Sequence, residues 1–322
     1  MRILITGIAG FMGSHLAGYL IKNGHNHISG IIRSGSDRIS SIDFIESKLD
    51  IHECDLLDAA TLEPIISKVK PDLVFHLASE LPRANFTGNP VNMYLSNIIG
   101  TLNLLESIRT HGTETKIIMA GSSREYGAIL PGECPVKEDH PLNPADPYAL
   151  SKAAQFFMGS EYVKHFGMKI FFARVFYLTG PGQPAGFVCS SIARQAVLVK
   201  KGLAPNIVIG NREVRRDFVD VRDVVEALFL ISERGRPGEV YNVCSVKGHR
   251  IEDVLNIIKN LLQLDDVTVY NEPALTRKNE SPVITGDNSK ISSETGWSPL
   301  ITLEKSLEDL LRDIERQTAG KD

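Results

Sequence analysis

A run of glycines directly after the first apolar segment constrains this chain more than any other sequence feature. Residues 2–6 read RILIT, and Gly7-Ile8-Ala9-Gly10-Phe11-Met12-Gly13 follows and opens an amphipathic stretch from Met12 to Asn23. Glycines between a strand and a helix permit a tight turn and let the backbone approach a pyrophosphate closely. The free N–H groups of the helix N-terminus then favour a phosphate. The sequence therefore predicts that Gly7, Gly10 and Gly13 bind a dinucleotide.

Short apolar segments alternate with longer amphipathic ones through the first half of the chain. The predicted strands are RILIT, HISGII, KLDIHEC, DLVFHLA, KIIMAGS and KIFFARVF, and the predicted helices are Met12–Asn23, Ala59–Lys70, Val91–Thr110 and Pro147–Phe166. Such alternation indicates βαβ units and a parallel sheet with helices on both faces. The predicted fold class is α/β, with a doubly wound parallel sheet of the Rossmann type.

The pattern changes after residue 176. The Pro- and Gly-rich run GPGQPAG leads into a predicted helix over 187–200 and a short strand around Ile207. A helix over 221–233 and the run EVYNVCS are interpreted as returns to the sheet, and helix, strand and helix follow from Ile251. We predict a nucleotide-binding domain over 1–176 with returning segments at about 217–246. A smaller C-terminal substrate domain is predicted over 177–216 and 247–322.

Composition limits the partners that need to be considered. The net charge of −4 over 322 residues favours neither nucleic acid nor an acidic membrane surface. No apolar stretch approaches the roughly 20 residues of a membrane helix, and the chain starts MRILITG without a leader pattern. Its four cysteines lie far apart, at 54, 134, 189 and 244, and form no CxxC pair. These observations predict a cytoplasmic protein with reduced thiols and no metal centre.

The second predicted strand ends in Arg33-Ser34, which bears on the choice of cofactor. Enzymes that use NAD usually place an acidic residue near this point to hold the ribose 2′-hydroxyl. The forked, positively charged guanidinium of Arg33 suits a 2′-phosphate instead. We therefore expect NADP(H), although a strand-end arginine can also simply face water. Asp55, after the third strand, is interpreted either as an acceptor for the adenine amino group or as an ordinary turn residue.

Three residues form a candidate catalytic group. Tyr148 and Lys152 stand four apart in a predicted helix and so share one face. The lysine can depress the pKa of the tyrosine through its charge and hold the cofactor ribose. The tyrosine can then pass a proton to a carbonyl oxygen during hydride transfer. Ser122 ends the strand KIIMAGS, at the edge where parallel sheets bind ligands, and can orient that carbonyl.

Four motifs in this order, TGIAGFMG, DLVFHLAS, AGSSREYG and YALSK, resemble those of the extended short-chain dehydrogenase/reductases over nearly the whole chain. That superfamily includes sugar-nucleotide epimerases, 4,6-dehydratases and 4-keto reductases. The resemblance implies a homodimer formed through helices 91–110 and 147–166. It also implies further cofactor contacts from Phe11, Met12, Ser34, Leu56, Leu77 and Ala78, besides Lys152.

The C-terminal half is most similar to the GDP-mannose branch. In GNREVRRDFVDVRDVV, the arginine before the aspartate is Arg216, which the resemblance assigns to the nucleotide diphosphate. The segment that starts at Arg277 and runs through TGDNSKISSETGWSP resembles one in GDP-sugar dehydratases and reductases, and it implies nucleotide contacts from Arg277 and Glu280. The run GPGQPAGFV resembles a loop of the GDP-4-keto-6-deoxy-mannose reductases. Further substrate contacts are implied for Ser123, Arg124, Tyr177 and Arg194.

One position separates the reactions known in this superfamily. The dehydratases use a glutamate two positions before the motif tyrosine, where this chain has Arg124, two before Tyr126. A guanidinium stays protonated and cannot act as a base, and Glu125, one position off, is expected to point elsewhere. Epimerase/reductases use a cysteine at the same position and a histidine where this chain has Gly182. The remaining chemistry is 4-keto reduction of GDP-4-keto-6-deoxy-D-mannose by NADPH, giving GDP-D-rhamnose or its C4 epimer.

Several interpretations stay open at this point. The reductases usually carry Asn-His just before the GPGQ loop, whereas this chain has Tyr177-Leu178, so a different GDP-sugar such as a GDP-heptose derivative is an alternative substrate. An NDP-sugar 4-epimerase would keep the same three catalytic residues but recycle NAD, which Arg33 disfavours. A 4,6-dehydratase and a non-catalytic nucleotide sensor are two further candidate functions. A sensor would have no need of intact Ser122, Tyr148 and Lys152.

Overall fold

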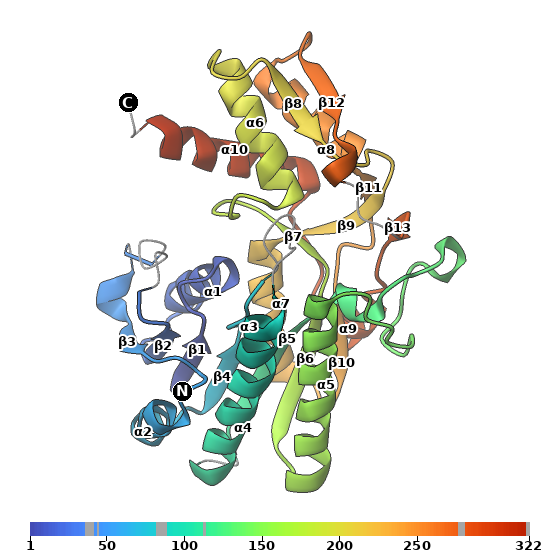
Figure 1. Cartoon of the computed structure of the whole chain (residues 1–322). Coiled ribbons are helices and arrows are strands. Elements are labelled where there is room, and N and C mark those ends of the chain that lie inside the picture. The colour runs from blue at the N-terminus through green and yellow to red at the C-terminus, as the bar shows by residue number, and fades with distance from the viewer. Residues whose placement is uncertain (36–41, 44, 82–88, 112–113, 276–280, 320–322) are drawn as a thin grey trace.

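A computed structural model describes residues 1–35, 42, 43, 45–81, 89–111, 114–275 and 281–319. Within this part of the chain, the largest sheet has seven parallel strands in the order β10-β6-β5-β4-β1-β2-β3 (Figure 1). The strands are β1 (Ile3–Thr6), β2 (Ile28–Ile32), β3 (Asp50–Glu53), β4 (Leu73–His76), β5 (Lys116–Ser122), β6 (Lys169–Val175) and β10 (Val240–Val243). All six strands predicted for the first half are confirmed, as is the return of EVYNVCS to the sheet.

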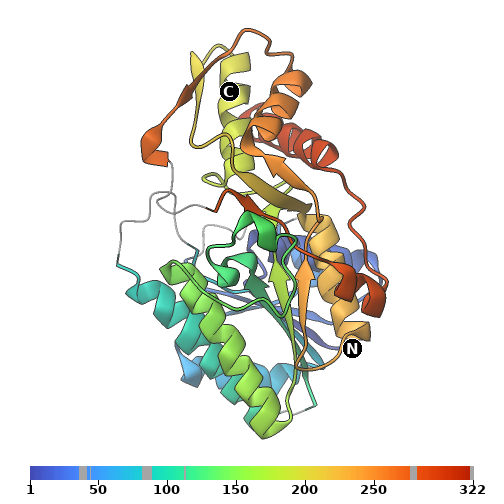
Figure 2. The same ribbon diagram turned by 90° about the vertical axis from the view of Figure 1, so that its right-hand side faces the viewer.

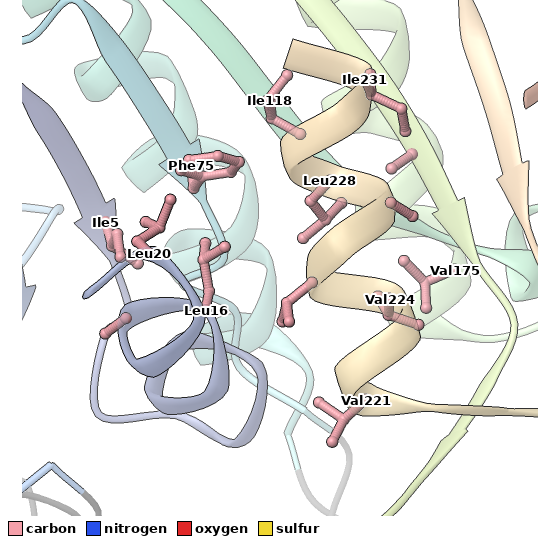
Figure 3. Close-up of a cluster of buried hydrophobic side chains, with 14 of the residues drawn as sticks. Ile5, Leu16, Leu20, Phe75, Ile118, Val175, Val221, Val224, Leu228 and Ile231 are labelled. Carbon is pink, nitrogen blue, oxygen red and sulfur yellow. The ribbon is translucent and has the colours of Figure 1, made fainter. Parts of the chain in front are cut away.

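Helices cover both faces of this sheet. They are α1 (Phe11–Lys22), α2 (Ala59–Val69), α4 (Gly100–His111), α5 (Pro147–Phe166) and α7 (Val221–Arg234). Ile5, Phe75 and Ile118 pack with α1 and α7 on one face (Figure 3). Their strand neighbours Leu4, Val74 and Ile117 pack with α2, α4 and α5 on the other. Successive strand residues point to opposite faces, so strands that are apolar along their whole length are the expected result. The doubly wound fold is confirmed.

The helix predicted over Val91–Thr110 is confirmed, but it contains a π-helical turn that the sequence-based expectation did not include. It consists of α3 (Val91–Tyr94), a π-helical turn η3 (Leu95–Ile99) and α4. At the π turn, the buried Asn97 side chain accepts hydrogen bonds from Ser79 Oγ and Glu80 N and donates to Glu80 O and Ser151 Oγ. These bonds fix the segment after β4 and α5 against the turn. Single π turns are frequent at functional sites.

The later segments build a second, separate core. Strand β9 (Arg215–Asp220) pairs with β7 (Tyr177–Thr179), β11 (Gly248–Arg250) and β13 (Val283–Ile284), and β8 (Asn206–Ile209) pairs with β12 (Thr268–Asn271). Helices α6 (Val188–Lys200), α8 (Ile251–Leu262) and α10 (Leu303–Ala319) pack together around this core. Figures 1 and 2 show these helices gathered at the end of the molecule away from α2 and α4. The short turns of helix are η2 (Glu46–Lys48), η4 (Ser123–Tyr126), η5 (Pro131–Glu133) and η6 (Pro273–Leu275).

One segment of the predicted substrate domain returns to the large sheet. Helix α9 (Ser289–Thr295) contacts α7 and β10. Trp297, 1% exposed, belongs to the same core cluster as α1 and α7, and its indole Nε1 donates to Asp223 O at 2.9 Å. Residues 289–297 therefore add to the nucleotide-binding half, while the domain ranges as a whole stay a prediction.

None of the helices described by the structure combines the length and the apolar character that crossing a membrane requires.

The Trp297→Ala substitution tests whether this returning segment is part of the main core. We expect it to lower the free energy of unfolding by about 3–5 kcal/mol, because it removes a buried ring and leaves a cavity. Urea denaturation followed by circular dichroism measures the change. Leu300→Ala is the matched control, since Leu300 is 76% exposed and should change stability by no more than about 0.5 kcal/mol. Equal effects of the two substitutions would show that the segment does not support the core.

Candidate active site

Three neighbouring strands bring the predicted residues to one edge of the sheet. Strands β1, β4 and β5 are adjacent and parallel, so their carboxyl ends lie side by side. The glycine loop follows β1, Leu77 and Ala78 follow β4, and Ser122 ends β5. This edge is where open parallel sheets of this class bind their ligands.

The glycine loop has a geometry that only glycine permits. Gly7 has φ 71°, and a Cβ there would lie 2.9 Å from the Cα of Ala78. A Cβ at Gly13 would lie 2.3 Å from the carbonyl oxygen of Gly7. Helix α1 begins at Phe11, and Gly10 before it makes no side-chain cap hydrogen bond. N–H groups at a helix N-terminus favour an anion. The loop therefore fits a dinucleotide pyrophosphate.

The residues predicted to select the cofactor lie at the ends of neighbouring strands. Arg33 and Ser34 are exposed after β2, and Arg33 Nη1 lies 3.6 Å from Glu80 Oε2, with 63% of the arginine side chain exposed. Asp55 accepts a hydrogen bond from Leu57 N at 3.0 Å, as a turn aspartate does. Leu56 is buried. The position of Arg33 leaves its guanidinium accessible to a phosphate, and the adenine role of Asp55 stays a prediction.

The structure brings Ser122, Tyr148 and Lys152 together. Helix α5 starts at Pro147 because Asp146 caps it, with Asp146 Oδ1 accepting from Ala149 N at 3.0 Å. Tyr148 lies in the first turn of α5, and Lys152 lies one turn further on. The Ser122 side chain lies close enough to the Tyr148 phenol to lower its pKa. Lys152 is buried, and its Nζ donates to Ala120 O at 2.8 Å.

The pKa of Tyr148 differs from the sequence-based expectation. Burial raises the pKa of Tyr148 to about 12, and the charge of Arg124 opposes that rise most strongly. Lys152 was expected to supply the opposing charge, but Arg124 is the cation with the largest effect on Tyr148. Burial also lowers the pKa of Lys152 to about 8, against the charge of Glu125. Tyr148 thus keeps its proton at neutral pH and can donate it to a carbonyl oxygen.

Arg124 is placed to act on Tyr148. Its guanidinium carbon lies 5.6 Å from the centre of the Tyr148 ring, a cation–π geometry. Arg124 Nη2 also donates to Asp146 Oδ2 at 2.5 Å. Since Asp146 Oδ1 caps α5, this ion pair ties η4 to the start of the helix that carries Tyr148. The positive charge beside the phenol is therefore held in place by two separate elements.

Glu125 and Arg174 are buried residues that the sequence-based site did not include. Glu125 points away from Tyr148, as predicted, with Oε1 accepting from Ser122 N at 2.7 Å and Oε2 accepting from Arg174 Nε at 2.8 Å. Two signals in the sequence mark them. Ser122-Ser123-Arg124-Glu125 fits a capping box, and Arg174 is a lone charge inside the apolar strand KIFFARVF.

A buried hydrogen-bond network connects the carboxyl ends of β1 and β4 to helices α4 and α5. The Thr101 hydroxyl donates to Asn97 O at 2.6 Å and so must accept from His76 Nε2 and Gln155 Nε2. His76 therefore carries its proton on Nε2, and its Nδ1 accepts from the Thr6 hydroxyl at 2.8 Å. Burial lowers the pKa of His76 to about 3, which keeps the ring neutral. His76 is thus a structural residue.

The predicted substrate residues are only partly brought together. Arg216 is buried, donates to Arg215 O and Ser281 O, and stacks at 5.4 Å over the Tyr177 ring. Ser123 is buried in η4. Arg194 lies on α6 and donates to Gln317 of α10 at 3.0 Å. Arg277 and Glu280 lie outside the described residues.

Among the residues that the structure describes, no group of three or more His, Cys, Asp or Glu side chains is arranged to hold a metal ion.

Comparison with known proteins identifies the family. The family described as GDP-mannose 4,6 dehydratase matches residues 4–310. GDP-6-deoxy-D-mannose reductase from Pseudomonas aeruginosa is 31% identical over 98% of this chain and 97% of its own length. GDP-mannose 4,6 dehydratase 2 from Arabidopsis thaliana is also 31% identical, over 97% of this chain and 86% of its own.

Solved structures give the same result. RMD from P. aeruginosa complexed with NADPH has a TM-score of 0.85 and 29% identity, covering 98% of this chain and 100% of that one. UDP-glucose 4-epimerase from Thermus thermophilus, in complex with NAD, has a TM-score of 0.86 and 26% identity, covering 98% and 99%. The chain therefore belongs to the GDP-mannose 4,6 dehydratase family, among the sugar-nucleotide enzymes of the extended short-chain dehydrogenase/reductases.

Proposed function

We propose that this chain catalyses the NADPH-dependent reduction of the 4-keto group of GDP-4-keto-6-deoxy-D-mannose, giving GDP-D-rhamnose or its C4 epimer. The observation that carries this proposal is the assembled group Ser122, Tyr148 and Lys152 with an arginine–aspartate ion pair beside it. These residues provide for hydride transfer to a carbonyl, and the ion pair stands where other reactions of the family need an acid–base group.

Sequence identity does not decide between reductase and dehydratase, because relatives of both kinds are 31% identical. Residue chemistry does discriminate. Loss of water from a sugar needs a group that can take up and release a proton. The Arg124 guanidinium remains charged, and both oxygens of Asp146 are engaged, by Arg124 Nη2 and by Ala149 N. Glu125 is turned into the protein and bound to Arg174. The described site therefore favours reduction.

Different residues of the chain have different roles in the proposed reaction. The glycine loop holds the pyrophosphate, Arg33 holds the 2′-phosphate and Lys152 holds the ribose of the cofactor. NADPH supplies the hydride to the keto carbon. Ser122 donates a hydrogen bond that orients the carbonyl oxygen, and Tyr148 gives its proton to that oxygen, so the product is an alcohol. Arg124 stabilises the phenolate that Tyr148 becomes, since it lies over the ring.

Preference for a guanosine diphosphate sugar is supported by the relatives and by the C-terminal motifs. Arg216 and Tyr177 are stacked on each other, at the junction of β7 and β9. We propose that this pair lies next to the nucleotide diphosphate, as the C-terminal motifs indicate. We propose that Arg194, Arg277 and Glu280 complete the nucleotide site.

The proposed reaction is tested by following NADPH absorbance with GDP-4-keto-6-deoxy-mannose, made in situ by a separate dehydratase. We expect rapid oxidation of NADPH. Tyr148→Phe should reduce kcat by about 10²–10⁴-fold, because the proton donor is lost, while NADPH still binds. Dehydration of GDP-mannose by the purified wild-type chain, or C4 epimerisation of an NDP-sugar without net oxidation of NADPH, would contradict the proposal.

The role of Arg33 is tested by comparing the two nicotinamide cofactors. Arg33→Ala should raise the KM for NADPH by about 10–100-fold, because a hydrogen bond to a charged group contributes about 1.5–3 kcal/mol. The KM for NADH should be unchanged, and it serves as the internal control. Glu80→Gln removes the carboxylate that competes for Arg33 and should lower the KM for NADPH. Equal changes for both cofactors would show that Arg33 does not contact the 2′-phosphate.

We further propose that the protein is a cytoplasmic homodimer formed through α3, η3 and α5. Val91, Leu95 and Ile99 stand four residues apart and are 39–48% exposed. On α5, Leu150 and Phe157 stand seven apart and are 48% and 57% exposed. Residues at these spacings lie on one helical face, and the two helical segments pack against each other. Together they form an apolar surface that suits a second copy of the same surface.

Light scattering after gel filtration tests the dimer. The wild-type protein should have twice the chain mass of 35.5 kDa. Phe157→Glu should give the monomer mass, because it places a charge within the apolar surface. Leu203→Glu is the control, since Leu203 is 71% exposed on a different part of the chain, and it should leave the dimer intact. A monomeric wild-type protein would refute this assembly.

A further inference from the structure

A small cavity, with a wall that is mainly apolar, lies beside Lys152. Its volume is about 10 Å³, and four of its lining residues carry polar or charged groups, namely Lys152, Glu125, Gln155 and Arg174. That volume holds the centre of about one water molecule, and a buried water needs two to four polar partners. Gln155 already donates to Asn97 O and to Thr101 Oγ1. The cavity therefore has room for about one water molecule, with Lys152, Glu125 and Arg174 among the residues of its wall.

The carboxylate at this cavity is fixed in place. Glu125 is 1% exposed and Arg174 is 2% exposed, and Glu125 bonds to both Ser122 N and Arg174 Nε. A Cβ at Gly121 would lie 2.4 Å from Glu125 Oε1, so the carboxylate occupies the space that a side chain there would fill. Arg174 also donates to Tyr126 Oη and Glu138 O. The Glu125–Arg174 ion pair is thus fixed by three further hydrogen bonds, with Ser122 N, Tyr126 Oη and Glu138 O.

The Lys152 ammonium can donate more hydrogen bonds than the one to Ala120 O. Its ammonium carries three N–H groups, and Ala120 O accepts one of them. A water in the cavity can accept a second, which leaves the third for a cofactor hydroxyl. The charged and titratable groups around it are Glu125 from η4, Arg174 from β6, His76 from β4 and Tyr148 from α5.

The charge of Lys152 depends on Glu125. His76 is neutral because its pKa is about 3, and Tyr148 is neutral because its pKa is about 12. Burial lowers the pKa of Lys152, and the negative charge of Glu125 opposes that change. Arg174 adds a second cation in the same buried region, so without Glu125 two positive charges would share it. A buried ammonium without a counter-charge tends to lose its proton.

We propose that Glu125 is a positioning residue that, through one water molecule in this cavity, keeps the Lys152 ammonium protonated and directed at the cofactor ribose. This inference rests on the proposed role of Lys152 in holding the cofactor. It gives the Glu125–Arg174 pair a function besides folding, because the pair sets the pH range in which Lys152 can bind.

The test is the pH dependence of the NADPH dissociation constant, measured without sugar from the fluorescence of bound NADPH. In the wild-type protein, binding should weaken as pH rises above about 8, the pKa of Lys152. In Glu125→Gln, the weakening should begin about one pH unit lower or more, because loss of the opposite charge favours the neutral amine. Lys152→Met should abolish this pH dependence and so assign it to Lys152.

Two further variants separate this role from a purely structural one. Glu138→Gln is the matched control, since Glu138 is a partly buried carboxylate that bonds to Asn242 N, and its pH profile should match the wild type. Glu125→Gln/Arg174→Met removes both charges and keeps the protein testable if the single variant does not fold. Its transition should lie between those of the wild type and Glu125→Gln, because the repulsion from Arg174 is also gone.

An unchanged transition in both Glu125 variants would overturn the proposal. A crystal structure of the NADPH complex should show a water bonded to Lys152 Nζ and Glu125, and a dry cavity would overturn the bridging role. These measurements need no sugar substrate, so their outcome is independent of whether the chain reduces a GDP-4-keto sugar. Failure of the reductase assay with the expected NADPH profile would reject only the proposed reaction.

Discussion

The fold and the candidate site both depend on hydrogen bonds made by backbone groups at the carboxyl end of β5. Ala120 O accepts from Lys152, and Ser122 N donates to Glu125, which fits only because residue 121 is a glycine. A buried backbone group without a partner costs about 1–3 kcal/mol, so these side chains complete the fold at this point. The same contacts orient Lys152 and Ser122 toward the site. Folding and placement of the candidate catalytic groups therefore rest on one set of hydrogen bonds.

The charges around Tyr148 come from two different sides. Arg124, which forms an ion pair with Asp146, lies over the ring. Lys152 donates a hydrogen bond to Ala120 O, with Glu125 nearby. This arrangement leaves Tyr148 protonated at neutral pH, because burial raises its pKa to about 12. A protonated phenol is the form that reduction of a ketone requires, since the carbonyl oxygen must gain a proton. The positive charge of Arg124 becomes most favourable when the phenol has given its proton away.

Sequence patterns identified the elements that are set locally. The six strands of the first half, the glycine loop and α5 were predictable because apolar runs, glycines and caps act within a few residues. The i, i+4 spacing also placed Tyr148 and Lys152 on one face. The π turn within the helix over 91–110 was not predictable in this way, because it involves bonds from Asn97 to Ser79, Glu80 and Ser151. Those partners lie 18, 17 and 54 residues away along the chain.

The sequence by itself determined the doubly wound sheet through its periodicity and the family through its motifs, and the same motifs predicted the group Ser122, Tyr148 and Lys152. Only the tertiary structure decided which charges act on that group. Glu125 meets Arg174 across 49 residues, and Arg124 meets Asp146 across 22. Hydrogen bonds and ion pairs act over a few ångströms in space, whatever the separation along the chain. The folded sheet brings those groups within that range. Burial then strengthens the interactions between their charges, because the protein interior has a low dielectric constant.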